Sequence, residues 1–159
     1  MNKFQVVSRS EQETIDIAGT MAPYFELGDV LLLDGDLGTG KTQFVKGFTA
    51  ALGSSDGVTS PTFTIAQFYN ISQGSLLHID TYRLADINEF RDTGLADYFS
   101  QSIVLIEWGT KIIDEFDTYF GVEFANVPAD KDQRVLTFSY TGAGFAERFT
   151  LLSQKLANL

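Results

Sequence analysis

The sequence reads VLLLDGDLGTGKTQF over residues 30–44, and its segment 35–42 fits the pattern G-x-x-x-x-G-K-[ST] of a phosphate-binding loop, or P-loop. The apolar run at residues 30–33 precedes this loop, as expected of a buried strand. Apolar residues then recur at helical spacing, at Phe44, Val45, Phe48 and Leu52. A strand, a glycine-rich loop and a helix in this order predict a nucleotide-binding domain.

The chemistry of phosphate binding explains the composition of the loop. Glycines allow successive backbone N–H groups to curl around a phosphate at a helix start, which already favours anions. Lys41 would reach the β- and γ-phosphates, and the Thr42 hydroxyl would face Mg²⁺. As an exposed loop lysine, Lys41 would add little to the core. The nucleotide-binding residues predicted from the loop are Asp36, Leu37, Gly38, Thr39, Gly40, Lys41 and Thr42.

The length and composition of the chain limit its class. We expect one P-loop domain over residues 1–159, which is long enough for a sizeable core. No apolar run approaches the roughly 18 residues of a membrane span, and no basic-then-apolar leader begins the chain. The lack of cysteine excludes disulfides and Cys-based zinc sites and fits a reducing cytosol. These features predict a cytoplasmic protein with no membrane partner.

The negative charge of the chain is concentrated in one stretch. The net charge is −10, and residues 84–132 hold eleven Asp and Glu against three Lys and Arg, a net charge of −8. Such a surface repels the phosphates of nucleic acid, so direct nucleic-acid binding is not expected. The stretch is either a solubilising surface or a docking face for a basic partner protein.

Strand and helix signals alternate along the rest of the chain. The capping box at residues 10–13 predicts a helix whose inner face holds Ile15, Ala18, Ala22 and Phe25. Residues 85–99 predict short helical pieces broken at Gly94, and residues 145–156 predict a closing helix. Strands are expected at residues 4–7, 63–69, 76–80, 103–106, 120–124 and 136–140. The expected fold class is α/β, with a P-loop NTPase-like mixed sheet of parallel and antiparallel strands flanked by helices.

Two of the predicted strands end in a carboxylate. Asp80 closes the strand at residues 76–80, and Glu107 follows the strand at residues 103–106. An acid at the carboxyl end of a buried strand lies where α/β sheets bind ligands. In a P-loop fold such an acid holds Mg²⁺, often through water, or orients the attacking water. The residues themselves do not assign these two roles between Asp80 and Glu107.

Several neighbouring residues allow two interpretations. His78, the only histidine, shares a strand face with Asp80. It either hydrogen-bonds a carboxylate or shuttles a proton, or it is a structural residue. Arg83 either stabilises phosphate charge or pairs with an acid such as Asp80. The hydroxyl-rich residues 59–64 form either a switch segment near the γ-phosphate or a polar turn that opens a strand. Trp108 either packs over the site or belongs to the aromatic core.

Five sequence blocks together resemble the TsaE family, also called YjeE. They are GDLGTGKT at 35–42, SPTFTI at 60–65, HIDTYRL at 78–84, GLADYF at 94–99 and IEW at 106–108. That family comprises bacterial P-loop ATPases of tRNA N6-threonylcarbamoyladenosine (t6A) biosynthesis. The resemblance implies ATP and Mg²⁺ as cofactors and TsaD and TsaB as partners, which modify adenosine 37 of tRNAs reading ANN codons. It also implies that hydrolysis resets the complex between turnovers, without threonylcarbamoyl transfer by this chain and without direct stable tRNA binding.

The resemblance also implies roles for individual residues. Lys41 would bind phosphates, Thr42 and Glu107 would hold Mg²⁺, and Asp80 would serve catalysis, so the implied catalytic set is Lys41, Asp80 and Glu107. Trp108 would lie at the nucleotide site and the partner interface, and the region around Ser10 is similar to the segment that approaches the adenine. The C-terminal third carries no matching signature.

Three rival functions are weighed against this interpretation. A small-molecule P-loop kinase usually brings an Arg-rich lid, whereas the five arginines here form no cluster. A GTP switch needs an N-K-x-D motif, but the only Asn-Lys pair, Asn2-Lys3, is followed by Phe4-Gln5. A nucleotide-dependent scaffold that does not hydrolyse ATP differs from the ATPase only in phosphate release.

Overall fold

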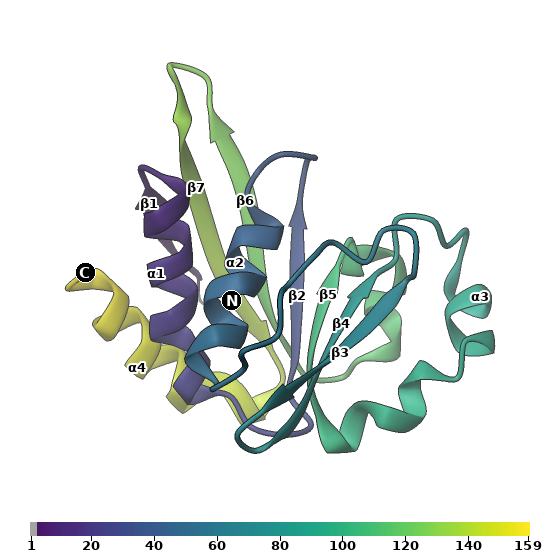
Figure 1. Ribbon diagram of the computed structural model, residues 1–159. Coiled ribbons are helices and arrows are strands. Elements are labelled where there is room, and N and C mark those ends of the chain that lie inside the picture. The colour runs from purple at the N-terminus through teal and green to yellow at the C-terminus, as the bar shows by residue number, and fades with distance from the viewer. Residues whose placement is uncertain (1–2) are drawn as a thin grey trace.

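Strands and helices alternate along residues 3–159, the part of the chain that the computed structural model describes (Figure 1). The strands are β1 (Lys3–Ser8), β2 (Val30–Gly35), β3 (Ala66–Ile71), β4 (Gly74–Asp80), β5 (Ser102–Glu107), β6 (Tyr119–Val127) and β7 (Asp130–Thr141). The α-helices are α1 (Glu11–Met21), α2 (Lys41–Ala51), α3 (Ile87–Asp92) and α4 (Ala146–Ala157). The 3-10 helices are η1 (Ala22–Tyr24), η2 (Leu95–Gln101), η3 (Gly109–Glu115) and η4 (Ala143–Phe145).

The strands form one sheet in the order β1-β7-β6-β2-β5-β4-β3. The central strand β2 runs parallel to β5 and β6, and β4 runs parallel to β5. The pairs β1–β7, β6–β7 and β3–β4 are antiparallel. The predicted mixed α/β sheet is therefore confirmed. The carboxyl ends of β2, β4, β5 and β6 meet at one edge, where the β2–α2 loop lies (Figure 1).

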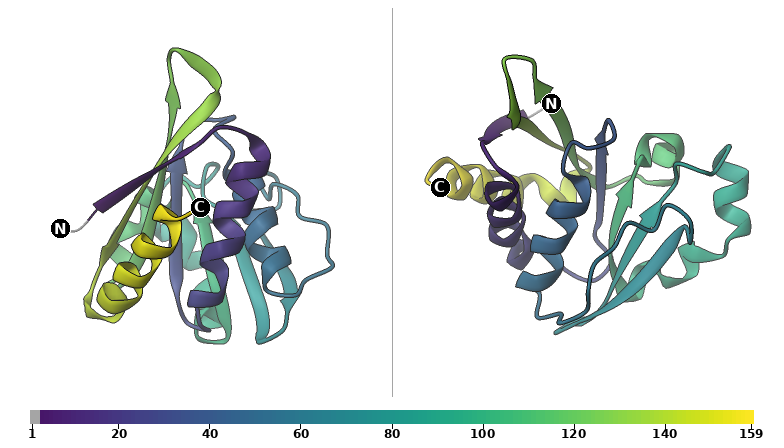
Figure 2. Two further views of the ribbon diagram at one scale, coloured as in Figure 1. Left: turned by 90° about the vertical axis from the view of Figure 1, so that its left-hand side faces the viewer. Right: turned by 45° about the horizontal axis from the view of Figure 1, so that its top comes forward.

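Alternating side chains of the central strands build a separate core on each face of the sheet. Leu31, Leu33 and Leu105 pack with α1, α2 and α4 on one face. Leu32, Ile79 and Ile106 pack with α3 and η3 on the other. Helices α1 and α2 lie side by side in both views of Figure 2. Among residues 3–159, no helix is long and apolar enough to cross a membrane.

Helix α1 begins where the sequence predicts, and its buried face differs from the prediction at Ile15. The Ser10 hydroxyl accepts a hydrogen bond from the Glu13 N–H at 3.1 Å, as in a capping box. Ile15 is only half-buried, and the inner face consists of Thr14, Ile17, Ala18 and Met21. Of the other predicted residues, Ala18 lies on this face, while Ala22 and Phe25 are buried in the same core but follow α1, which ends at Met21 and is followed by a 3-10 turn.

The third strand begins later than its apolar residues suggest. It starts at Ala66 and not at residue 63, because residues 61–65 form a turn in which the Ile65 N–H donates to the Pro61 carbonyl at 2.7 Å. Ile65 has a φ of 71°, a left-handed conformation that interrupts an extended chain. The Phe63 side chain is 84% exposed, so its apolar character does not mark a buried strand here.

Candidate functional site

The β2–α2 loop places the amino terminus of α2 at the carboxyl edge of the sheet. Gly40 caps α2 with a φ of 100°, a left-handed conformation that glycine adopts without a Cβ penalty. Gly35 passes so close to β6 that a Cβ there would lie 2.7 Å from the Phe124 carbonyl oxygen. The loop therefore has its glycines where the chain must turn tightly or approach a neighbouring strand closely, as an anion-binding helix start requires.

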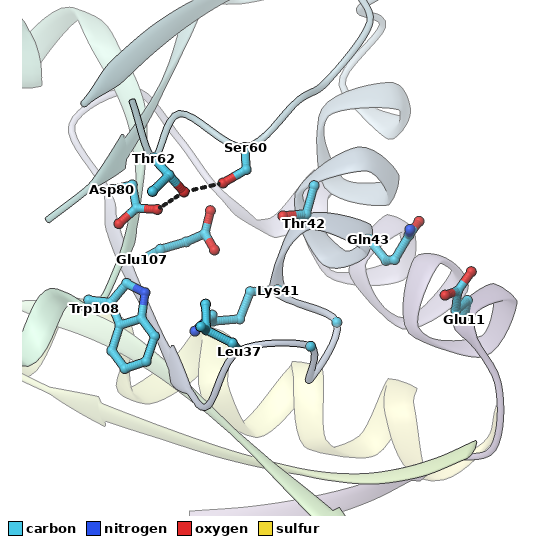
Figure 3. A pocket seen from close by; sticks show the side chains of 12 residues that line it. Glu11, Leu37, Lys41, Thr42, Gln43, Ser60, Thr62, Asp80, Glu107 and Trp108 are labelled. Carbon is cyan, nitrogen blue, oxygen red and sulfur yellow. Dashed lines mark hydrogen bonds between the residues drawn. The ribbon is translucent and has the colours of Figure 1, made fainter. Parts of the chain in front are cut away.

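A cavity of about 230 Å³ opens beside this helix start. Figure 3 shows side chains from the loop, from the ends of β4 and β5 and from the segment before β3 around one space. Eight predicted site residues line it, namely Leu37, Gly38, Gly40, Lys41, Thr42, Asp80, Glu107 and Trp108. The structure thus brings together the loop and both strand-end carboxylates.

The remaining predicted residues lie elsewhere. Ser10 and Thr39 line a smaller neighbouring cavity of about 50 Å³, which shares Gly38 and Gly40 with the first. Asp36 lines neither cavity; it is exposed, and its carbonyl oxygen accepts a hydrogen bond from the Thr39 hydroxyl at 2.7 Å. Asp36 thus supports the loop through its main chain.

Lys41 is buried, unlike the exposed loop lysine expected from the sequence. Its ammonium group donates to the Gly35 carbonyl and lies 3.7 Å from the centroid of the Trp108 ring. Burial lowers the pKa of Lys41 from its ordinary value, while the negative charges of Glu107, Asp80 and Asp34 oppose that shift. The lysine is therefore a desolvated cation in an acidic, aromatic pocket.

The two strand-end carboxylates lie directly opposite each other on β4 and β5. Asp80 accepts two hydrogen bonds, from the Thr62 hydroxyl to Oδ2 at 2.9 Å and from the Tyr82 N–H to Oδ1 at 2.8 Å. Glu107 Oε2 lies 2.6 Å from His78 Nε2. Both carboxylates are nearly inaccessible, so these donors and the nearby Lys41 are what offset the cost of burying them.

The structure distinguishes between several of the interpretations that the sequence left open. His78 bonds a carboxylate, that of Glu107. Arg83 is exposed, and its guanidinium lies 5.6 Å from the centroid of the Phe63 ring. The ion pairs formed within residues 3–159 do not include one between Arg83 and Asp80. Ser60 and Thr62 line the cavity with their hydroxyls 2.8 Å apart, so the segment before β3 borders the site.

Trp108 occupies the cavity wall in an unusual backbone conformation. Its φ is 62°, in the left-handed region that non-glycine residues seldom adopt. Two hydrogen bonds hold it there, one from its N–H to the Leu33 carbonyl at 3.0 Å and one from the Thr81 hydroxyl to its carbonyl at 2.7 Å. Strain of this kind concentrates at functional sites.

Apart from Ser60 and Thr62, five lining residues were not predicted as site residues, and one of them is Thr14 in the smaller cavity. Glu11 and Gln43 line both cavities, and their only sequence signal is proximity to the capping box and to the P-loop. Asp132 and Arg134 reach the smaller cavity from β7, and Arg134 donates to the Gly38 carbonyl at 3.1 Å. No local pattern could identify these two, because the sheet pairing places them there.

The donor set of the cavity suits Mg²⁺ bound together with a phosphate ligand. The described part of the chain holds no group of three or more His, Cys, Asp or Glu side chains that could bind a metal alone. Mg²⁺, however, is usually held by one or two carboxylates, with water and substrate phosphates completing its shell. Thr42, Asp80 and Glu107 offer oxygen donors on the same cavity.

Comparisons with known proteins identify the family of the chain. A family model described as "Threonylcarbamoyl adenosine biosynthesis protein TsaE" matches residues 8–135, well beyond the last matching block at 106–108. A tRNA threonylcarbamoyladenosine biosynthesis protein TsaE of Bacillus subtilis is 40% identical over 147 residues, which cover 92% of this chain and 89% of the relative. That of Treponema pallidum is 36% identical over 130 residues, covering 81% of this chain and 96% of the relative.

A solved structure shares the fold of this chain. The crystal structure of Bacillus subtilis YdiB superimposes with a TM-score of 0.77 at 32% sequence identity, covering 99% of this chain and 95% of that one. The predicted family resemblance is thereby confirmed in both sequence and fold. The chain belongs to the TsaE family.

Proposed function

We propose that this protein is a Mg²⁺-dependent ATPase that acts in the formation of t6A at position 37 of tRNA, together with TsaD and TsaB. The names of its relatives support the pathway. The observation that carries the ATPase proposal is the convergence of Lys41, Thr42, Asp80 and Glu107 on one cavity at the start of α2. A P-loop with two strand-end carboxylates is an arrangement suited to phosphoryl transfer to water.

Each side chain has a distinct part in the proposed reaction. Lys41 and the first N–H groups of α2 bind the β- and γ-phosphates. Thr42 and Glu107 hold Mg²⁺, which when bound neutralises the charge that develops on the phosphate oxygens. Asp80 orients the attacking water and accepts its proton; a carboxylate has about four lone-pair sites, so its bonds from Thr62 and Tyr82 leave room for a water.

The partner proposal rests on the charge and on the position of the site. The cavity is partly open, and Trp108, which lines it, lies within the acidic stretch 84–132. A TsaD–TsaB surface that docks on this stretch would contact bound nucleotide as well. Assembly would then depend on the γ-phosphate, and hydrolysis would release and reset the complex.

The test is phosphate release from Mg-ATP by the purified protein, measured with and without TsaD and TsaB, with Lys41→Ala as the control. We expect slow release by the protein alone and none by the variant. Equal release by parent and variant would contradict the assignment of the site. Nucleotide binding without any release, in either condition, would favour the scaffold, and ADP formation without free phosphate would favour a kinase. A pull-down in Mg-ATP identifies the partners directly.

A further inference from the structure

We propose that His78 is a positioning residue that orients the Glu107 carboxylate in the nucleotide site, by donating its Nε2 proton to Oε2. The proposal rests on the proposed function in one respect, namely that Glu107 serves as a metal ligand. His78 does not line the cavity itself, so it acts through Glu107.

The contact joins two neighbouring parallel strands beneath the cavity. His78 precedes Asp80 by two residues on β4, and Glu107 ends β5 opposite Asp80, so the three side chains share one face of the sheet. His78 Nε2 lies 2.6 Å from Glu107 Oε2, and the two side chains are 0% and 4% exposed. Figure 3 shows the Glu107 carboxylate pointing into the cavity toward Thr42. A buried histidine thus holds the inner side of a carboxylate whose outer side meets the ligand space.

The other ring nitrogen identifies the tautomer. Among residues 3–159, His78 Nδ1 is the buried side-chain polar atom that has no hydrogen-bond partner. A proton on Nδ1 would leave a buried N–H unsatisfied and would turn the Nε2 lone pair toward a carboxylate oxygen. A proton on Nε2 gives that carboxylate a short, charge-assisted hydrogen bond and leaves only an acceptor without a partner. Of the two neutral tautomers, the geometry therefore selects the Nε2–H form.

This arrangement assigns different tasks to the two oxygens of Glu107. Oε2 is occupied by His78, whereas Oε1 makes no hydrogen bond to any side chain or backbone group among residues 3–159. A carboxylate held by one oxygen cannot rotate freely, so Oε1 stays directed at the ligand. Removing the outer partner of a metal-binding side chain typically weakens metal affinity about 10- to 100-fold.

The first test is independent of nucleotide and of activity. Because His78 is the only histidine, a long-range ¹H–¹⁵N spectrum of the untagged protein reports its ring alone. We expect a ring proton on Nε2, and we expect the Nε2 signal to move in Glu107→Ala. An Nδ1–H ring, or signals that Glu107→Ala leaves unchanged, would overturn the proposal whether or not the protein is an ATPase.

The second test measures binding of a fluorescent methylanthraniloyl ADP with Mg²⁺ and with EDTA. His78→Leu and His78→Asn should lose about tenfold or more of the affinity gained from Mg²⁺, while affinity in EDTA stays at the parent value. For His78→Gln, the affinity gained from Mg²⁺ should stay within about threefold of the parent value. The Gln amide nitrogen reaches as far as Nε2 of the histidine, whereas the Asn amide nitrogen reaches only as far as Nδ1. Thermal unfolding of each variant controls for folding.

A double-variant cycle separates positioning from a general loss of structure. If His78 acts through Glu107, His78→Leu should have no further effect on the Mg²⁺ dependence in the Glu107→Ala background. Equal losses in Mg²⁺ and EDTA, or equal behaviour of the Gln and Asn variants, would overturn the proposal. If the variants do not fold, the spectrum of the parent protein still decides.

Discussion

Replacing Gly47 by alanine is expected to destabilise the protein, because α1 and α2 pack too closely for a side chain at this position. A Cβ on Gly47 would lie 2.2 Å from the Ile15 carbonyl oxygen and 2.9 Å from the Ile15 Cα. These are backbone atoms of a helix, so they cannot rotate away as a flexible side chain would. The helices would have to move apart by roughly 1 Å in a close-packed core.

The expected magnitude combines two opposing contributions. Alanine gains about 1 kcal/mol of helix propensity over glycine. Overpacking a close-packed core costs up to about 3 kcal/mol, and a backbone obstacle places Gly47 at the upper end of that range. We therefore expect the free energy of unfolding to fall by about 2 kcal/mol, the difference between these two contributions.

Gly19→Ala is a matched control on the same helix pair. A Cβ on Gly19 would lie 3.7 Å from the Gly47 carbonyl oxygen and 3.8 Å from the Ala51 Cβ, which are ordinary contacts. Only the propensity gain applies, so this variant should be more stable than the parent by about 0.5 to 1 kcal/mol. Urea unfolding followed by circular dichroism measures both variants. The reasoning is refuted if Gly47→Ala is as stable as the parent, or if both variants shift in the same direction.

Four further predictions concern the site and the surface. Lys41→Ala should abolish phosphate release but change the free energy of unfolding by less than about 1 kcal/mol. The variant no longer buries a charge, and this gain offsets the lost contacts to Gly35 and Trp108. Unchanged phosphate release by the purified variant would contradict the prediction. Thr42→Ala and Glu107→Ala should each raise the Mg²⁺ concentration needed for half-maximal hydrolysis; a Mg-nucleotide complex with Glu107 far from the metal and no bridging water would rule the ligand role out. Asp80→Asn should spare nucleotide binding, measured by fluorescence, and lose hydrolysis, because an amide cannot act as a base; hydrolysis at the parent rate would make Asp80 structural. Binding to TsaD–TsaB should weaken as the salt concentration rises and should require the γ-phosphate, and labelled tRNA should not bind at low salt. Micromolar tRNA binding would contradict the charge argument, and assembly equally tight with ATP, ADP and no nucleotide would contradict the coupling.

Local patterns in the sequence were enough to predict the kind of site and to locate the main elements of the fold. The P-loop could be identified because its function depends on contiguous backbone N–H groups, glycines and one lysine, all within residues 35–42. Asp80 and Glu107 could be placed at strand ends because a run of apolar residues that stops at an acid is also a local pattern. Local signals likewise located the start of α1 and the break at Gly94.

The environment of these residues depends on contacts between segments that are distant in the sequence. The burial of Lys41 against Trp108 depends on how residues 108 and 41 approach across the sheet edge. The bond from His78 to Glu107 joins residues 29 positions apart, and that from Arg134 to Gly38 joins residues 96 positions apart. The turn at Ile65, which delays β3, is likewise fixed by a hydrogen bond from the Asp80 N–H to its carbonyl. These contacts follow from strand order and register, which arise from the packing of distant segments and leave no periodic signal in the sequence around any one residue.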